Sequence, residues 1–337
     1  MHGDGMPTAT IMTYDCIHRG DPIGQGACNS CEGNVSLKIF RCSKHTVCTI
    51  AKRIDGSQPA IGSYMVCSGC SDRVEPTSIE WIAKKAIWLL ECRQRLLSDE
   101  IVDINYLMFE RIFFRDFYRL NRPVVMRGVI DWPAIELWKS PQYLLERVGS
   151  SDIEVQCGRN ADPNFEPNSN ALKSRMPFAR FVEAVETGPG GNDIYMTANN
   201  SSSNRGATFA LWNDIGRLPY LDESERGRFL WYGPAGTFTP LHHDLTNNLV
   251  VQVRGRKTVR LVAPEQLASM ENRVHCYSGV KLDDGVVRHQ SVEILPGDVL
   301  FIPVGWWHDV RSLDVSMTIT FTNFTEANDF SSFYPVQ

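Results

Sequence analysis

Long apolar runs are missing from this sequence. No stretch reaches the roughly 18 apolar residues that a membrane-spanning helix needs, and residues 1–10 lack a charged segment followed by an apolar one. We therefore expect no membrane span and no secretory signal. We place the protein in the cytoplasm, where thiols are normally kept reduced.

An excess of basic residues is also absent. The 34 lysines and arginines are outnumbered by 39 aspartates and glutamates, which gives a formal net charge of −5. A phosphate backbone is held by a basic surface, so the composition gives no strong signal for a nucleic-acid partner. With 337 residues, 43% of them hydrophobic, the chain is long enough for a sizeable core and a small accessory domain.

Cysteine is scarce after residue 75 and concentrated before it, where long apolar runs are few and burial alone offers little core. Two C-x-x-C pairs in this segment have the spacing by which two thiolates chelate one ion. Seven cysteines and one of two histidines would supply eight ligands, enough for two tetrahedral zinc ions. The candidate ligands are Cys16, His18, Cys28, Cys31, Cys42, His45, Cys48, Cys67 and Cys70.

Other chemistry is open to these thiolates. An iron–sulfur cluster is the main alternative to zinc, and reduced or disulfide-bonded cysteines are a third. Residues 1–75 are expected to form a small Cys-rich, zinc-binding domain. This segment lacks a basic patch with interleaved aromatics. A protein-docking role or a purely structural role therefore suits it better than nucleic-acid recognition.

Helical periodicity begins after Pro76. Thr77-Ser78-Ile79-Glu80 matches a capping box, and apolar residues recur at helical spacing beyond it. This predicts a connecting helix over residues 76–100. A second helical stretch over about 107–120 leads into a short β-type run at 122–126, so we expect a larger domain over residues 101–337.

Short strand candidates dominate the rest of the chain. Turn residues such as Gly255 and Gly285 separate them, and two polar stretches, 158–175 and 199–207, predict mobile loops. Many short strands with few late helices indicate an all-β sandwich or barrel core. Strands are expected at 153–157, 193–197, 229–232, 249–253, 258–262, 299–303 and 316–321.

The most informative motif is His242-His243-Asp244. Side chains alternate across a strand, so His242 and Asp244 point to one face and His243 to the other. A third ligand is predicted in His308, at the end of Gly305-Trp306-Trp307-His308. Two histidines and one carboxylate with open positions form the facial triad of non-haem iron(II) oxygenases. An H-x-D motif alone would more often be a surface or hydrogen-bonded pair.

In order and spacing, these motifs resemble the Jumonji-C family of cupin-type oxygenases, specifically its hydroxylase branch. The resemblance covers about residues 101–337 and implies a double-stranded β-helix, the jelly-roll barrel of cupins, in a mainly β chain with flanking helices. It also implies Fe(II), 2-oxoglutarate and O2 as cofactors, with decarboxylation to succinate coupled to C–H hydroxylation. The segments that carry it are Arg122-Pro123-Val124-Val125, Thr239 to Asp244, Gly255-Arg256-Lys257 and Pro303 to His308.

The resemblance assigns roles to further residues. Lys257 matches the family lysine that pairs with the far carboxylate of 2-oxoglutarate, and a buried dicarboxylate does need a buried cation. Four polar residues match positions near the co-substrate, namely Thr239, Tyr195, Asn248 and Asn323. The alternatives are a solvated turn lysine for Lys257, and core packing or strand-edge hydrogen bonding for the other four.

A protein or peptide side chain is the substrate class that the hydroxylase pattern favours. Many family demethylases carry glutamate where Asp244 stands, which disfavours demethylation of methyl-lysine. Thr325 replaces a bulky aromatic of the branch's asparaginyl hydroxylase, so the substrate of that enzyme is not transferred. The alternatives are a small-molecule hydroxylase and a non-catalytic cupin that serves as a metal-binding scaffold. Since family hydroxylases are often dimers, the resemblance also suggests a homodimer.

Overall fold

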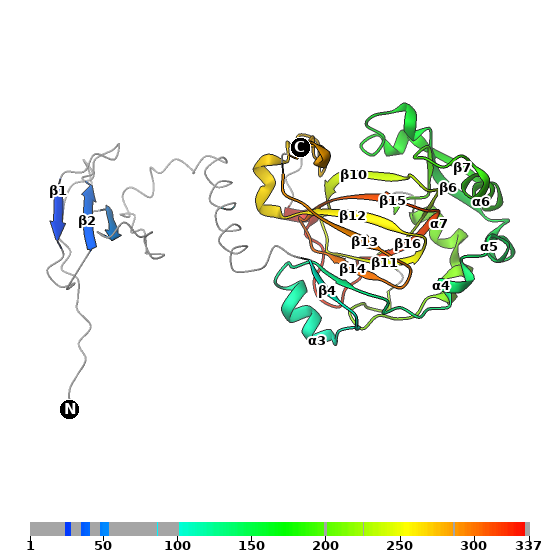
Figure 1. Ribbon diagram of the computed structural model, residues 1–337, viewed down its shortest axis with the longest axis horizontal. Helices are drawn as coiled ribbons and strands as arrows, with labels where there is room; N and C mark the ends of the chain where they lie inside the picture. Colours follow the sequence, from blue (N-terminus) through cyan, green and yellow to red (C-terminus); the bar gives the residue numbers. More distant parts are fainter. Residues whose placement is uncertain are drawn as a thin grey trace. The chain divides into compact units, whose positions relative to one another are not determined.

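The computed structural model describes residues 101–198, 201–224, 226–285 and 287–333, together with Ala86 and the backbone of three strands nearer the N-terminus (Figure 1). The chain divides into two compact units, residues 1–86 and 87–337. Apart from Ala86, the connecting helix expected over residues 76–100 lies outside the described residues. Within the described part, no helix has the length and apolar character needed to cross a membrane.

The first unit contains an antiparallel meander. Its strands are β1 (Gly24–Ala27), β2 (Val35–Phe40) and β3 (Cys48–Arg53), and β2 lies between the other two. Each strand pairs with the next one along the chain, as expected where short connections join antiparallel neighbours.

The second unit is built around two sheets whose strands pair antiparallel, apart from the parallel pair of β4 and β5. Between β9 and β16, successive strands alternate between a six-stranded sheet, β4-β5-β14-β11-β16-β9, and a four-stranded sheet, β10-β15-β12-β13, with only β12 and β13 adjacent in one sheet. This is the alternation of a jelly roll, so the expected fold is present (Figure 1). The strands are β4 (Val102–Ile104), β5 (Val124–Met126), β9 (Arg228–Gly233), β10 (Phe238–His243), β11 (Asn248–Arg254), β12 (Lys257–Val262), β13 (Gln290–Ile294), β14 (Val299–Ile302), β15 (Trp307–Ser312) and β16 (Ser316–Phe321).

A smaller sheet and short helices lie beside the barrel. The sheet has the order β7-β6-β8, and Figure 1 shows α5, α6 and β7 at the same end of the unit. The elements are α4 (Ala134–Leu137), α5 (Pro141–Val148), β6 (Asp152–Cys157), β7 (Lys173–Pro177), α6 (Phe178–Thr187), β8 (Ile194–Tyr195) and α7 (Ser201–Ala207). With β6 and β8, all seven strands expected in the larger domain are confirmed.

The two polar stretches expected to be mobile loops are corrected by the structure. Residues 158–175 contain the 3-10 helices η2 (Arg159–Ala161) and η3 (Ser169–Leu172) and the start of β7, while 201–207 form α7. The polar side chains order these segments by hydrogen bonding. Asn204, for example, accepts from the backbone N–H of Glu154 and donates to its carbonyl, both over 2.7 Å.

The helical stretch expected over 107–120 is shorter than predicted. It comprises α3 (Glu110–Phe113) and a π-helical turn over Phe114–Tyr118. Phe113 is fully buried and stacks on Tyr220, with 4.1 Å between ring centroids. Aromatic packing against the barrel therefore fixes this segment.

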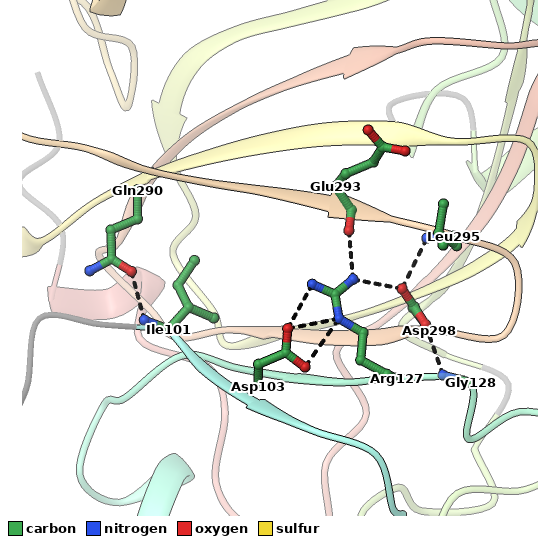
Figure 2. Close-up of polar contacts among 8 residues, drawn as sticks. All are labelled: Ile101, Asp103, Arg127, Gly128, Gln290, Glu293, Leu295 and Asp298. Carbon is green, nitrogen blue, oxygen red and sulfur yellow. Dashed lines mark hydrogen bonds and ion pairs between the residues drawn. The ribbon is translucent and has the colours of Figure 1, made fainter.

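A buried carboxylate joins the entry strands to the barrel (Figure 2). Asp298, only 3% exposed, accepts from Nη1 of Arg127 and from the backbone N–H groups of Gly128 and Leu295 over 2.8, 2.8 and 3.0 Å. Arg127 also pairs with Asp103 on β4. One network thus connects β4 and β5 to the turn between β13 and β14.

Candidate metal centre

Two histidines lie opposite each other on adjacent strands of the four-stranded sheet. In the antiparallel pairing of β10 with β15, His242 lies opposite His308, and their ring centroids are 4.3 Å apart. The carboxylate oxygens of Asp244, directly after β10, lie 3.7 Å from Nε2 of each histidine. The structure thus brings the three predicted ligands together, with donor atoms within 4.8 Å of one another.

Backbone carbonyls orient both imidazoles. Nδ1 of His242 lies 2.8 Å from the carbonyl oxygen of Pro240, and Nδ1 of His308 lies 3.0 Å from that of Trp306. Because a carbonyl oxygen only accepts, each Nδ1 carries the proton and each Nε2 lone pair is left for a cation. A hydrogen bond of this kind also fixes the ring of a metal-binding histidine.

Burial and neighbouring groups set the protonation of the ligands. Burial, with a smaller contribution from His242, lowers the pKa of His308 to about 4. Burial opposes ionisation of Asp244, yet His308 and His242 hold the pKa of its carboxyl below the usual value, and the amide of Asn248 donates to its Oδ2 over 3.0 Å. Neutral imidazole and ionised carboxylate are the forms that bind a metal ion.

The donor set suits iron(II). Two imidazole nitrogens and one carboxylate oxygen, grouped on one side of a cation, leave other coordination positions open. The pairing of β10 with β15 is irregular between Thr239 and His242, and such irregularities re-aim side chains next to active sites. A three-ligand site that opens into a cavity differs from the closed four-ligand sites of structural zinc.

A cavity of about 480 Å³ lies against the triad. Its lining includes all three ligands, Lys257, and three of the other four predicted residues, Thr239, Tyr195 and Asn248. This volume falls within the range of small-molecule sites. The candidate metal centre and most of the candidate co-substrate residues therefore share one space.

Lys257 is buried in the wall of this cavity, with 3% of its surface exposed. Its Nζ donates to the hydroxyl of Tyr195 over 3.1 Å, and among the described residues no carboxylate forms an ion pair with it. Burial lowers the pKa of Lys257 to about 7. An anionic ligand in the cavity would supply the missing counter-charge.

Asn323 lies outside the lining of the cavity, unlike the other predicted co-substrate residues. Its Nδ2 donates to the carbonyls of Asp222 and Ser224 over 2.9 and 3.1 Å, and to Oδ1 of Asp222 over 3.1 Å. The neighbouring Thr322 does line the cavity. Because adjacent side chains on an extended chain point to opposite faces, Asn323 is directed to the 222–224 turn instead.

Several wall residues were missed by the sequence reasoning. Phe229 and Trp231 on β9 line the cavity, as do Thr318 and Thr320 on β16, and Nε1 of Trp231 donates to Oγ1 of Thr320 over 3.0 Å. Their spacing of two is the signal that could have identified them. Other wall residues come from segments where no periodicity marks them: Glu166, His275, Cys276 and Tyr277.

The candidate zinc ligands lie almost entirely outside the described residues. The exception is Cys48, whose backbone begins β3. The metal chemistry of the Cys-rich segment therefore stays a prediction.

Comparison with known proteins places most of the second unit in one family. Residues 110–329 match the family model for the cupin-like domain. Lysine-specific demethylase JMJ30 of Arabidopsis thaliana is 29% identical over 248 residues, covering 65% of this chain and 54% of that protein. Lysine-specific demethylase 8 of Xenopus tropicalis is 31% identical over 230 residues, covering 62% and 49%.

A relative with a different name also matches. The tRNA wybutosine-synthesizing protein 5 of Gallus gallus is 26% identical over 237 residues, which cover 61% of this chain and 72% of that protein. The chain spans only about half the length of the two demethylases. The relatives therefore align with a similar portion of this chain, whereas their names point to different substrates.

Proposed function

Because this chain belongs to the cupin-like, Jumonji-C family of iron(II)- and 2-oxoglutarate-dependent oxygenases, we propose that it hydroxylates a C–H bond of a protein or peptide side chain and converts 2-oxoglutarate to succinate. The observation that carries this proposal is that one cavity contains an open ligand triad and a buried lysine that has no acidic partner among the described residues. A triad of this kind suits iron(II), and a buried lysine suits a carboxylate.

His242, Asp244 and His308 would hold the iron. When bound, iron and 2-oxoglutarate supply the oxygen activation that side chains cannot provide. Asn248 keeps the Asp244 carboxylate oriented through the hydrogen bond to Oδ2. Oδ1 of Asn248 is buried and has no hydrogen-bond partner among the described residues, so it offers an acceptor to a water or ligand in the site.

Lys257, Tyr195 and Thr239 would hold 2-oxoglutarate. The ammonium group of Lys257 neutralises the far carboxylate, and the two hydroxyls can donate to it. All three residues line the cavity, and Lys257 donates a hydrogen bond to the hydroxyl of Tyr195. These polar groups therefore lie together on the part of the wall that would receive the carboxylate.

A protein side chain fits the space that remains. The cavity of about 480 Å³ is at the lower end of the usual range for small-molecule sites, and 2-oxoglutarate would take part of it. What is left suits one side chain entering from a larger partner. The second hypothesis is hydroxylation of a metabolite, and the third is a non-catalytic protein that serves as a metal-binding scaffold.

Demethylation of methyl-lysine is a separate candidate, favoured by the names of two relatives. Hydroxylation of an N-methyl carbon would release formaldehyde, so both activities use the same cavity and cofactors. They differ in the product, because side-chain hydroxylation leaves the substrate one oxygen heavier, whereas demethylation replaces a methyl group by hydrogen and leaves the substrate one CH2 lighter.

The proposal is tested by 2-oxoglutarate turnover against a peptide and metabolite panel that includes methyl-lysine peptides. We expect succinate formation, with gain of one oxygen in a peptide and no turnover in His242→Ala. Formaldehyde with loss of a methyl group would establish demethylation, and oxygen gain in a metabolite would establish the second hypothesis. Absence of both succinate and an anaerobic Fe(II)–2-oxoglutarate charge-transfer band would favour the scaffold.

We also propose that the Cys-rich segment binds two zinc ions. The support is the ligand spacing described above, which supplies eight donors for two tetrahedral sites. Elemental analysis of the full chain carrying His242→Ala should give about two zinc per chain. Paired replacement of Cys28 and Cys31 by serine should remove one of them, whereas iron with inorganic sulfide would overturn the zinc assignment.

A further inference from the structure

Arg159 is a buried arginine that lies behind the cavity wall. It belongs to η2, its side chain is 0% exposed, and it is not among the residues that line the cavity. Arginine is almost never fully buried unless it is paired. The hydrogen bonds and the ion pair of Arg159 must therefore offset the cost of burying its charge.

The guanidinium group binds parts of the chain that are far apart in sequence. Nη2 donates to the carbonyl of Phe238 over 2.8 Å, Nε donates to the carbonyl of Asn192 over 3.1 Å, and Nη1 donates to Oε1 of Gln156. Oδ1 of Asn192 in turn accepts from the backbone N–H of Phe238 over 2.9 Å. Arg159 and Asn192 thus fix both backbone polar groups of Phe238, the first residue of β10.

Two candidate co-substrate residues are immediate neighbours of this group. Thr239 follows Phe238 on β10, and the guanidinium carbon of Arg159 lies 5.3 Å from the centre of the Tyr195 ring. Tyr195 also accepts the hydrogen bond from Lys257. Arg159 therefore lies against Tyr195, which is hydrogen-bonded in turn to the buried ammonium group of Lys257.

The carboxylate of Glu166 balances the positive charge of Arg159. Its Oε1 lies 2.9 Å from Nη1 of Arg159 but outside hydrogen-bond geometry, and both side chains are at least 95% buried. Within the described lining, Lys257 is the one lysine or arginine. A dicarboxylate in the cavity would therefore pair with Lys257, while Arg159 is already neutralised.

We propose that Arg159 is a positioning residue for the co-substrate, one that sets the affinity for 2-oxoglutarate through Tyr195 and the Phe238–Thr239 backbone without touching the ligand. The inference rests on the function proposed above. A rigid guanidinium fork can serve several acceptors in fixed directions, whereas a lysine ammonium is a point charge on a flexible stem.

The chain offers a control in a second arginine–glutamate pair, which is partly buried. Arg254 donates to both carboxylate oxygens of Glu186 over 2.6 and 2.8 Å, and the two side chains are 15% and 16% exposed. Neither residue lines the cavity. Removing this pair should cost stability without changing the co-substrate site.

The test compares charge-balanced double variants of the full chain. Arg159→Met/Glu166→Gln and Arg254→Met/Glu186→Gln each remove one pair without leaving a lone buried charge. Binding of Mn²⁺, and then of 2-oxoglutarate to the Mn²⁺-loaded protein, is measured by calorimetry, and thermal unfolding of the metal-free protein reports stability. We expect the first double variant to bind 2-oxoglutarate about 10- to 100-fold more weakly with Mn²⁺ affinity within about twofold, and the second to bind both ligands like the unmodified chain.

Arg159→Lys provides a milder variant if the double variant does not fold. It keeps the positive charge but loses the guanidinium group that serves several acceptors. We expect 2-oxoglutarate affinity to fall while Mn²⁺ affinity is unchanged. Unchanged 2-oxoglutarate affinity, or an equal loss in both double variants, would overturn the proposal. An equal loss of Mn²⁺ and 2-oxoglutarate affinity would also overturn it, because Arg159 would then only support β10. Failure of the unmodified chain to bind 2-oxoglutarate would refute the proposed function itself.

Discussion

Lys257 donates a hydrogen bond to the Tyr195 hydroxyl over 3.1 Å, and this is a contact between two fully buried polar groups on the wall of one cavity. A lysine in that position opposes folding unless a ligand compensates it, because desolvation penalises the ammonium form.

Replacing Lys257 by methionine should stabilise the protein and abolish co-substrate binding. The apolar side chain fills a similar volume without a buried charge, so we expect a gain on the order of 1–3 kcal/mol in the free energy of unfolding near neutral pH. Thermal unfolding of the metal-free protein and calorimetry with 2-oxoglutarate measure the two effects. A variant that is both less stable and still able to bind would contradict the assigned role.

Binding of 2-oxoglutarate should weaken as the pH rises above neutrality. Burial lowers the pKa of Lys257 to about 7, so the free site loses its ammonium group above that pH. The bound dicarboxylate favours the charged lysine and raises its pKa, so binding takes up a proton. Affinity should be nearly constant below pH 7 and fall up to about tenfold per pH unit above it.

Calorimetry in two buffers of different ionisation enthalpy measures this proton uptake directly. At pH 8 we expect uptake approaching one proton per bound 2-oxoglutarate. An identical binding enthalpy in the two buffers would mean that Lys257 does not change its protonation state on binding.

His308→Ala should remove tight metal binding, whereas His243→Ala should preserve it. His308 supplies one of three donor atoms. Its loss should therefore weaken metal binding by more than the roughly 10- to 100-fold that is typical when a residue supporting a ligand is lost. His243 packs edge-on against Trp307, with 4.7 Å between ring centroids, and it is not part of the triad. Titration with Mn²⁺ compares the two variants, and equal losses would argue against the assigned ligand set.

Asn248→Ala should weaken metal binding about 10- to 100-fold, because Asp244 loses the amide that orients its Oδ2. Asn323→Ala is the matched control, since its amide holds the 222–224 turn and is remote from the triad contacts. We expect the control to lower the melting temperature and leave Mn²⁺ affinity unchanged. The opposite pattern would assign the orienting role to Asn323.

Asp298→Ala should destabilise the barrel by about 1–3 kcal/mol. The variant leaves the backbone N–H groups of Gly128 and Leu295 without their acceptor and breaks the ion pair with Arg127 (Figure 2). Asp103→Ala removes the other ion pair of Arg127, but the Asp103 side chain is 54% exposed and the expected cost is about 0–1 kcal/mol. Urea unfolding of the two variants measures the difference.

The barrel strands and the candidate triad were accessible from sequence because their signals are local. Alternation along a strand placed His242 and Asp244 on one face, and the turn before His308 marked the third ligand. The same rule explains why Thr322 lines the cavity and Asn323 does not, since a shift of one position moves a side chain to the other face.

Other features could not be predicted because their partners are distant in sequence. Arg159 finds acceptors at Asn192 and Phe238, 33 and 79 residues away, and no spacing rule connects them. The polar stretch that contains it was expected to be a loop because it shows no periodicity. Order there comes from tertiary hydrogen bonds, which local composition does not encode.

The placement of His242 opposite His308 on β10 and β15 would also link iron supply to protein lifetime. Those two strands are separated by most of the barrel sequence, so the full ligand set exists only after the barrel has closed. Any ion that binds the completed set stabilises the closed form by mass action and reduces the fraction of chains open to proteolysis. Chains synthesised when iron is scarce would therefore be degraded faster, and the abundance of the enzyme would follow the availability of its metal.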